Sequence, residues 1–299
     1  MQKIIVAKIF GGLGNQMFQY AFGVSLAKMH NADLLVDIRS CSSSPRGFML
    51  SNFNITEKIA NEDEIKKFEG VVKLGRNTFA NFLSSPFKYM KYLTQRNCRI
   101  PERSHSYNEY NLHFNGNAYI YGAWQSPKYF CNIRNELHKI YTLKSKIDDK
   151  NLNILEKIAK TNSVSIHIRR GDYVSEKYKN DFVQLDINYY EKAIGYIKNK
   201  YPDAVFFIFS NDINWCKNNF GHSNTFKYVD QNSELAGHID MYLMSQCKHN
   251  IIANSTFSWW GAWLNQNESK IVICPSKWFG PNLKNHSIRD LYEESWIKL

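Results

Sequence analysis

The segment KIIVAKIFGGLGNQ, residues 3–16, decides the class of fold. Residues 3–9 are mostly apolar, as expected for a buried strand, and they run directly into a glycine turn. A helix follows, with Met17 and Phe18 on its apolar side, and a second short apolar strand is predicted at 34–37. A strand, a glycine turn, a helix and a strand at this spacing indicate a βαβ unit and therefore a sheet of parallel strands.

The second half of the chain alternates strands and helices regularly. A strand is predicted at 164–169, and Asp186 is of a residue type that caps the helix expected at 187–200. Ser233 is the expected N-cap of a helix at 234–247. The remaining predicted elements are strands at 205–209, 226–229, 251–253 and 271–274 and helices at 213–219 and 256–264. This rhythm predicts a parallel, doubly wound sheet.

Residues 39–117 show no such order, and we interpret them as an irregular insertion with short helices. The elements expected there and just after it are a helix at 57–68, a strand at 119–123 and a helix at 126–140. The polar stretch 144–149 is the best candidate for a domain boundary. The prediction is therefore an α/β protein with two Rossmann-like domains, residues 1–148 and 149–299, that face a cleft. The last 25 residues are expected to form a wrapping tail.

The composition is that of a globular protein. Of the 299 residues, 43% are hydrophobic and 22% charged, which excludes wholesale disorder, a collagen-like repeat and a coiled coil. The sequence has no apolar run of about 18 residues and no pattern of a secretory signal, so we expect a cytoplasmic protein. The six cysteines stand singly, without the spacing of a zinc site, and are expected to be reduced.

The charge favours an anionic partner. Lys and Arg number 38 against 27 Asp and Glu, a formal net charge of +11. Nucleic acid, a membrane surface and a phosphorylated small molecule are all compatible with it. The aromatic content of 15% fits stacking on sugars or bases and fits a well-packed core equally.

The sharpest local signal is HIRRGDY, residues 167–173, at the end of a predicted strand. Strand alternation places His167 and Arg169 on one face and Arg170 on the other, at the carboxyl edge where such sheets bind ligands. A guanidinium there can hold a phosphate through charge-assisted hydrogen bonds worth about 1.5–3 kcal/mol each. The structural alternative is an ion-pair network of Arg169, Arg170 and Asp172.

The glycine turn GGLGNQ, residues 11–16, is the second signal. It resembles half of a dinucleotide fingerprint, but Met17 stands where the third glycine is required, so we expect no nicotinamide cofactor. The amides near Gly14, the helix N-terminus and the side chain of Asn15 can donate to a phosphate oxygen. A tight turn with positive φ explains the glycines equally well.

The third signal combines Asp240 with the string NSTFSWWGAW, residues 254–263. The hydroxyl groups of Ser255 and Thr256 follow a buried strand at the start of a helix, where they can cap the helix and bind an anion. A carboxylate among apolar neighbours needs a partner if it is buried. The N1 and N2 hydrogens of guanine would supply one. In the alternative interpretation the serines are ordinary caps and the tryptophans belong to the core.

Together, these segments resemble the galactoside α-1,2-fucosyltransferases in their short, soluble bacterial form. They occur in the family's order, and the resemblance extends from residue 3 to about residue 275. It implies two Rossmann-like domains of the GT-B type, the second binding GDP-fucose and the first contributing the acceptor surface, without a cofactor or metal. In agreement, the chain contains no Asp-x-Asp, the pair that chelates diphosphate through a metal.

The resemblance also implies a role for individual residues. Arg169 would neutralise the β-phosphate as the glycosidic bond breaks, and Arg170 would support the same loop. The neighbours of Asp172 in the sequence indicate that it holds the two arginines in place. The residues implied to contact GDP-fucose are Gly14, Asn15, His167, Asp240, Ser255 and Thr256, with Asp240 reading the guanine. The general base stays open among Asp172, Glu176 and His167. A highly dissociative transition state would need no strong base, and we expect Asp172 not to be one.

The predicted reaction transfers L-fucose, with inversion, from GDP-β-L-fucose to the 2-hydroxyl of a terminal galactose in a free or lipid-linked oligosaccharide. We expect no nucleic-acid partner. We do expect peripheral association with an anionic inner membrane. Two alternatives stay open. The first is a fucosyltransferase of α-1,6 or protein-directed linkage, which shares the arginine motif. The second is a non-catalytic binder of oligosaccharide or single-stranded RNA, which would use the charge and the aromatic side chains.

Overall fold

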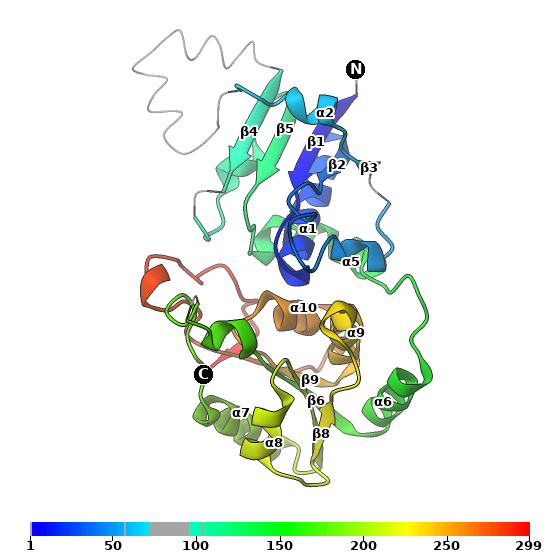
Figure 1. Ribbon diagram of the computed structural model, residues 1–299, viewed down its shortest axis with the longest axis vertical. Helices are drawn as coiled ribbons and strands as arrows, with labels where there is room; N and C mark the ends of the chain where they lie inside the picture. The colour runs from blue at the N-terminus through cyan, green and yellow to red at the C-terminus, as the bar shows by residue number, and fades with distance from the viewer. Residues whose placement is uncertain (1, 57, 72–95, 103, 177) are drawn as a thin grey trace. The chain divides into compact units, whose positions relative to one another are not determined.

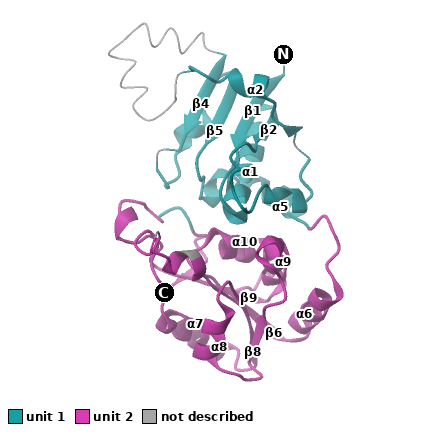
Figure 2. Ribbon diagram, viewed as in Figure 1, with its two compact units in different colours: residues 1–142, 289–291 teal, residues 143–288, 292–299 magenta. Residues whose placement is uncertain are grey.

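The computed structural model describes residues 2–56, 58–71, 96–102, 104–176 and 178–299, apart from the side chain of Asp172. Its residues form two compact units (Figure 2). Unit 1 comprises residues 1–142 and 289–291, and unit 2 comprises residues 143–288 and 292–299. Each unit has a parallel sheet, as the sequence predicts.

The sheet of unit 1 has the strand order β3-β2-β1-β5-β4. Its strands are β1 (Lys3–Lys8), β2 (Ala32–Asp37), β3 (Lys58–Ile59), β4 (Asn97–Pro101) and β5 (Asn117–Tyr121). The helices of this unit are α1 (Leu13–His30), α2 (Glu62–Lys66) and α5 (Arg134–Ile140), with 3-10 turns at Met49–Asn52, Glu109–Leu112, Pro127–Tyr129 and Cys131–Ile133. Helix α1 packs on β1 and β2 (Figure 1), and Asn31 ends it in the left-handed conformation that asparagine tolerates.

Two expectations for unit 1 are wrong in part. The helix expected at 57–68 is confined to α2, because β3 occupies its beginning and a capping box at Asn61 starts the helix only there. The helix expected at 126–140 is confined to α5. Pro127 starts a 3-10 turn, and a second such turn intervenes before the helix begins. The expected insertion also contributes the strand β4, while its residues 72–95 lie outside the described residues.

The sheet of unit 2 has the strand order β11-β10-β9-β6-β7-β8. Its strands are β6 (Asn162–Ile168), β7 (Ala204–Ser210), β8 (Phe226–Val229), β9 (His249–Ile251), β10 (Val272–Cys274) and β11 (Ile297–Lys298). The helices are α6 (Asp149–Lys160), α7 (Ile187–Lys200), α8 (Ile213–Phe220), α9 (Gly237–Gln246) and α10 (Thr256–Leu264), with 3-10 turns at Gly171–Val174, Glu234–Ala236 and Pro281–Leu283. All strand pairs in this sheet are parallel.

The sequence predicts the centre of unit 2 well and its periphery less well. Asp186 caps α7 by accepting from the amide of Tyr189 at 3.2 Å, as expected. Ser233 is wrong as a side-chain cap, because its side chain makes no cap hydrogen bond and a 3-10 turn precedes α9. The C-terminal tail supplies β11, which pairs with β10 and brings Trp296 into the core.

The core of unit 2 lies between the central strands and α7. Alternate residues of β6 and β7, including Val164, Ile166, Phe206 and Ile208, are fully buried against this helix. The strand β7 consists almost entirely of apolar residues, whereas β6 alternates polar and apolar residues, and both patterns are typical of strands. Along the parts of the chain that the structure describes, no helix has both the length and the apolar character needed to span a bilayer.

Candidate functional site

Two of the predicted segments meet at the carboxyl edge of the unit 2 sheet. The strands β6 and β9 are neighbours, so the chain that leaves each of them emerges at the same edge. The hydroxyl of Tyr173, after β6, donates to the carbonyl of Asn254, after β9, at 3.0 Å. The rings of His167 and Phe257 lie 5.3 Å apart. The HIRRGDY and NSTFSWW strings therefore form one local structure.

His167 ends up as a buried, neutral side chain. Only 4% of its surface is exposed, and its Nδ1 is buried without a hydrogen-bond partner. Burial, assisted by the charge of Arg169, lowers the pKa of His167 to about 3. The imidazole is thus a weak base, and it lines this edge of the sheet as a neutral ring.

Arg169 follows the last residue of β6 and lies over the ring of Tyr173, at 5.6 Å from the ring centre. That ring is itself stacked on Phe182, with ring centres 4.3 Å apart and an interplanar angle of 6°. Tyr173 therefore supports the guanidinium on one side and binds the neighbouring loop with its hydroxyl. A cation over an aromatic face gains about 0.5–1 kcal/mol at a partly exposed site.

Arg170 is engaged differently. Its Nε donates to Asp212 at 3.2 Å, and its guanidinium lies 4.4 Å from the centre of the Trp215 ring. Its backbone N–H donates to the side chain of Asn211 at 3.0 Å, and a β-carbon at Gly171 would overlap that same side chain. Arg170 therefore fixes the loop after β6 to the loop after β7. The side chain of Asp172 lies outside the described residues.

Side-chain hydrogen bonds fix the residues after β9. Ser255 caps α10 by accepting from the amide of Phe257 at 3.4 Å, and Thr256 is the first residue of that helix. Asn254 is buried and donates to the carbonyls of Val183 and Trp278, each at 2.9 Å. The sequence motifs alone indicate no role for Asn254 or Tyr173. For Asn254 the sequence did carry a signal, an asparagine between a predicted buried strand and a predicted helix, because a polar side chain buried there must find hydrogen-bond partners.

Trp259, Trp260 and Trp263 are all buried in the core, so the structural interpretation of these tryptophans is confirmed.

Asp240 lies in the first turn of α9, and Asn232 donates to its Oδ1 at 2.6 Å. Burial raises the pKa of Asp240 to about 6, although the hydrogen bond from Asn232 lowers it. The expectation that this carboxylate needs a partner is met in part by Asn232.

Gly14 and Asn15 lie in unit 1, in the first turn of α1. Gly11 has φ of +80°, the conformation that the glycine turn predicts. The N-cap residue Gly12 offers no side chain to the first amides of α1, and Nη1 of Arg46 would lie 3.5 Å from a β-carbon placed there. Asn15 accepts from Gln125 at 3.0 Å. Arg46, which no sequence motif indicates, adds a cation beside this helix N-terminus.

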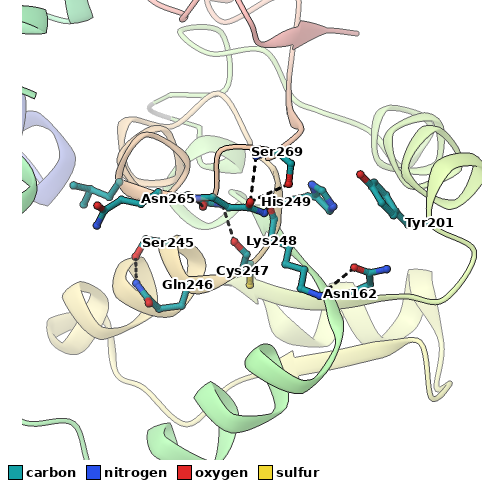
Figure 3. A pocket seen from close by; sticks show the side chains of 12 residues that line it. Asn162, Tyr201, Ser245, Gln246, Cys247, Lys248, His249, Asn265 and Ser269 are labelled. Atoms are coloured by element: carbon teal, nitrogen blue, oxygen red, sulfur yellow. Dashed lines mark hydrogen bonds between the residues drawn. The ribbon is translucent and has the colours of Figure 1, made fainter. Parts of the chain in front are cut away.

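A cavity of about 510 Å³ lies at the opposite, amino edge of the unit 2 sheet (Figure 3). No predicted site residue lines it. Its amide side chains are bonded to neighbouring groups: Asn265 donates to the carbonyl of Cys247 at 2.7 Å, and Lys248 donates to Asn162 at 3.3 Å. Among the described residues, no group of three or more His, Cys, Asp or Glu side chains is placed to hold a metal ion.

Comparison with known proteins identifies the family of the chain. Residues 2–299 match the family model of glycosyl transferase family 11. An alpha-1,2-colitosyltransferase of Escherichia coli is 36% identical over 305 residues, covering 99% of both chains. A galactoside alpha-(1,2)-fucosyltransferase 2 of Mus musculus is 25% identical over 271 residues, covering 88% of this chain and 69% of its own length.

Among solved structures, a mutant of Arabidopsis thaliana FUT1 in complex with GDP matches with a TM-score of 0.57 and 14% identity. The match covers 91% of this chain and 70% of that chain. At this identity the similarity establishes the fold, which is that of the GT-B fucosyltransferases. With a family model that spans nearly every residue and a relative of matching length, the chain belongs to glycosyltransferase family 11.

Proposed function

We propose that the protein is an inverting glycosyltransferase that moves L-fucose from GDP-β-L-fucose to the 2-hydroxyl group of a terminal galactose in an oligosaccharide. The observation that carries the proposal is the meeting of the arginine loop after β6 with the start of α10, joined by the bond from Tyr173 to Asn254. A guanidinium and a helix N-terminus at one sheet edge suit the diphosphate of a nucleotide sugar.

Breaking the bond between fucose and the diphosphate leaves an additional negative charge on the β-phosphate. Arg169 would neutralise this charge, and stabilisation of a developing charge is commonly the largest catalytic effect. Ser255 accepts a hydrogen bond with its oxygen as the cap of α10, which leaves its hydroxyl hydrogen for a phosphate oxygen. Thr256 would add its amide or hydroxyl at the same position. His167, neutral and buried, would line the nucleotide pocket.

The proton of the acceptor hydroxyl must leave as the new bond forms. His167 is a poor acceptor for it, because its pKa is about 3. We propose a highly dissociative transition state in which a phosphate oxygen or water takes the proton. Asp172→Asn should then keep substantial activity. A complete loss of activity in a folded Asp172→Asn variant would identify this residue as the base instead.

The experiment that tests the function is the rate of fucosyl transfer to galactosides by the wild type and by Arg169→Ala. We expect turnover to fall by several orders of magnitude, with an unchanged thermal transition. Arg96→Ala, which removes an exposed arginine of unit 1, is the matched control and should transfer at the wild-type rate. A near-normal rate for Arg169→Ala would remove the central assignment.

A second donor is favoured by one comparison. The Escherichia coli relative with 36% identity is named an alpha-1,2-colitosyltransferase. Colitose is fucose without its 3-hydroxyl group, so one diphosphate site would serve both sugars. Competition between GDP-fucose and GDP-colitose at equal concentrations decides between them, because the donor with the higher kcat/KM dominates the product.

The nucleotide preference is tested separately. In thermal shift experiments with GDP, GTP, UDP and NAD, we expect strong stabilisation by GDP only.

We further propose that transfer needs no metal ion, since the chain lacks an Asp-x-Asp pair and Arg169 would bear the phosphate charge. Activity should survive a chelator without loss.

We also propose peripheral association with an anionic membrane, which the net charge of +11 supports. Absence of binding to anionic vesicles at low salt would contradict that association.

A further inference from the structure

The carboxylate of Asp240 is connected to a chain of amide side chains that the steps above do not use. Asn232 donates to Oδ1 of Asp240 at 2.6 Å. The amide of Asn232 also forms a reciprocal pair with that of Asn151, in which each side chain donates to the other at 2.9 Å. Asn151 belongs to α6, some 80 residues earlier in the chain.

The side-chain amide of Asn151 is held in one orientation by its hydrogen bonds. It is completely buried, and both of its amide hydrogens are used, one toward Asn232 and one toward Asp148, the N-cap of α6, at 2.8 Å. Its oxygen accepts from Asn232 and, at 3.1 Å, from Gln231. A side-chain amide offers two donors and two acceptor sites, so every position of Asn151 is filled. Rotating its amide would break all of these bonds.

Asn232 uses three of its four hydrogen-bonding positions. One of its two amide hydrogens goes to Asn151 and the other to Asp240, and its oxygen accepts from Asn151. The orientation of the carboxylate is therefore set by a hydrogen-bonded amide pair rather than by α9 alone. Within the part of the chain that the structure describes, Oδ2 of Asp240 accepts no hydrogen bond, and Oδ1 keeps a second lone pair.

We propose that Asn232 and Asn151 are positioning residues of the nucleotide site and that they set its selectivity for guanine by orienting the carboxylate of Asp240. This inference rests on the proposed function and on the role expected for Asp240 from the sequence, in which its carboxylate accepts the N1 and N2 hydrogens of guanine. Two hydrogens in one plane require a carboxylate held in that plane. A well-placed pair of hydrogen bonds to a base edge discriminates by about 5- to 150-fold.

The experiment measures the dissociation constants of GDP, IDP and ADP by calorimetry. IDP lacks only the N2 amino group, so the ratio of IDP to GDP dissociation constants isolates one of the two contacts. For Asn232→Ala we expect GDP to bind about tenfold more weakly, with a fall in the IDP/GDP ratio, while ADP affinity stays unchanged. Asn224→Ala, an exposed asparagine of the same unit, is the matched control and should keep the wild-type ratio.

Asp240→Asn separates this inference from the function on which it rests. If Asp240→Asn keeps the wild-type IDP/GDP ratio, this residue does not read guanine and the proposed assignment fails. If Asp240→Asn loses the preference but Asn232→Ala retains it, the carboxylate needs no positioning and the present inference alone is overturned. A loss of affinity for GDP, IDP and ADP by the same factor in Asn232→Ala indicates a general structural defect, which also contradicts it.

Discussion

Replacing His167 by glutamine should remove much of the acid sensitivity of unit 2. In the folded protein the pKa of this imidazole is about 3, because the ring is buried beside Arg169. In the unfolded chain the pKa returns to its ordinary value near 6.5. Since the folded-state pKa is the lower one, the unfolded state binds the proton more readily, and stability falls as the pH drops below 6.5.

The size of the effect follows from the two pKa values. Between pH 7 and pH 5, a group with a pKa of about 6.5 unfolded and about 3 folded lowers the free energy of unfolding by about 2 kcal/mol. Asp240 acts in the opposite direction, because its pKa is raised on folding and its ionisation destabilises the folded state as the pH increases. The pH profile of the wild type mixes both effects, so the variant must be compared with the wild type.

Urea unfolding at pH 7 and pH 5, followed by tryptophan fluorescence, measures this difference. Six of the seven tryptophans belong to unit 2, so the signal reports mainly on that unit. The change in unfolding free energy between the two pH values should be about 2 kcal/mol smaller in His167→Gln than in the wild type. His222→Gln, at an exposed histidine of the same unit, controls for the substitution. An equal change in His167→Gln and the wild type would refute the reasoning.

Three further substitutions test individual contacts. Arg170→Ala should lower the stability of unit 2 by about 1 kcal/mol, and a double-mutant cycle with Asp212→Asn should show coupling, because the two side chains form a partly exposed ion pair. Gly116→Ala should lower the thermal transition of unit 1 strongly, because φ is +78° and a β-carbon would overlap the carbonyl of Arg96; an unchanged transition would contradict the described turn. Asp37→Asn should cost unit 1 about 1–3 kcal/mol at pH 7 in chemical denaturation. Burial raises the pKa of Asp37, but hydrogen bonds from its arginine and tyrosine partners lower it overall, so its stabilisation is present above pH 3.8 and this cost should shrink at lower pH.

The fold was predictable where burial on both faces leaves a strong pattern. In unit 2, β7 is almost wholly apolar and β6 alternates polar and apolar residues, and the helix after Asp186 begins at the predicted residue. The strand β4 was missed because it lies at an edge of its sheet and mixes polar residues with a terminal proline. Helix α6 was missed because its cap, Asp148, stands in a polar stretch that favoured a boundary over a helix start.

The candidate site was predictable in its motifs but not in its supports. HIRRGDY and NSTFSWW are specific strings, and their placement after two predicted strands brings them to one edge. The partners that hold them come from distant parts of the chain. Asn211 and Asp212 are about 40 residues from Arg170, and Asn232 is joined to a helix some 80 residues away. Pairings of this kind depend on tertiary packing, for which one sequence carries no pattern.

Arg169 and Arg170 make different contacts because β6 ends before them. The strand stops at Ile168, so the two arginines leave the sheet in a loop rather than on alternating faces of a strand. Arg170 is bonded to Asp212 and packed on Trp215, so it fixes the loop after β6. Its neighbour Arg169, in the same loop, lies over the ring of Tyr173. If Arg169 bears the phosphate charge, its loss should lower kcat with little change in stability. The loss of Arg170 should lower stability together with activity, and Arg170→Lys should not restore either, because an ammonium group cannot reproduce the planar contact with the indole.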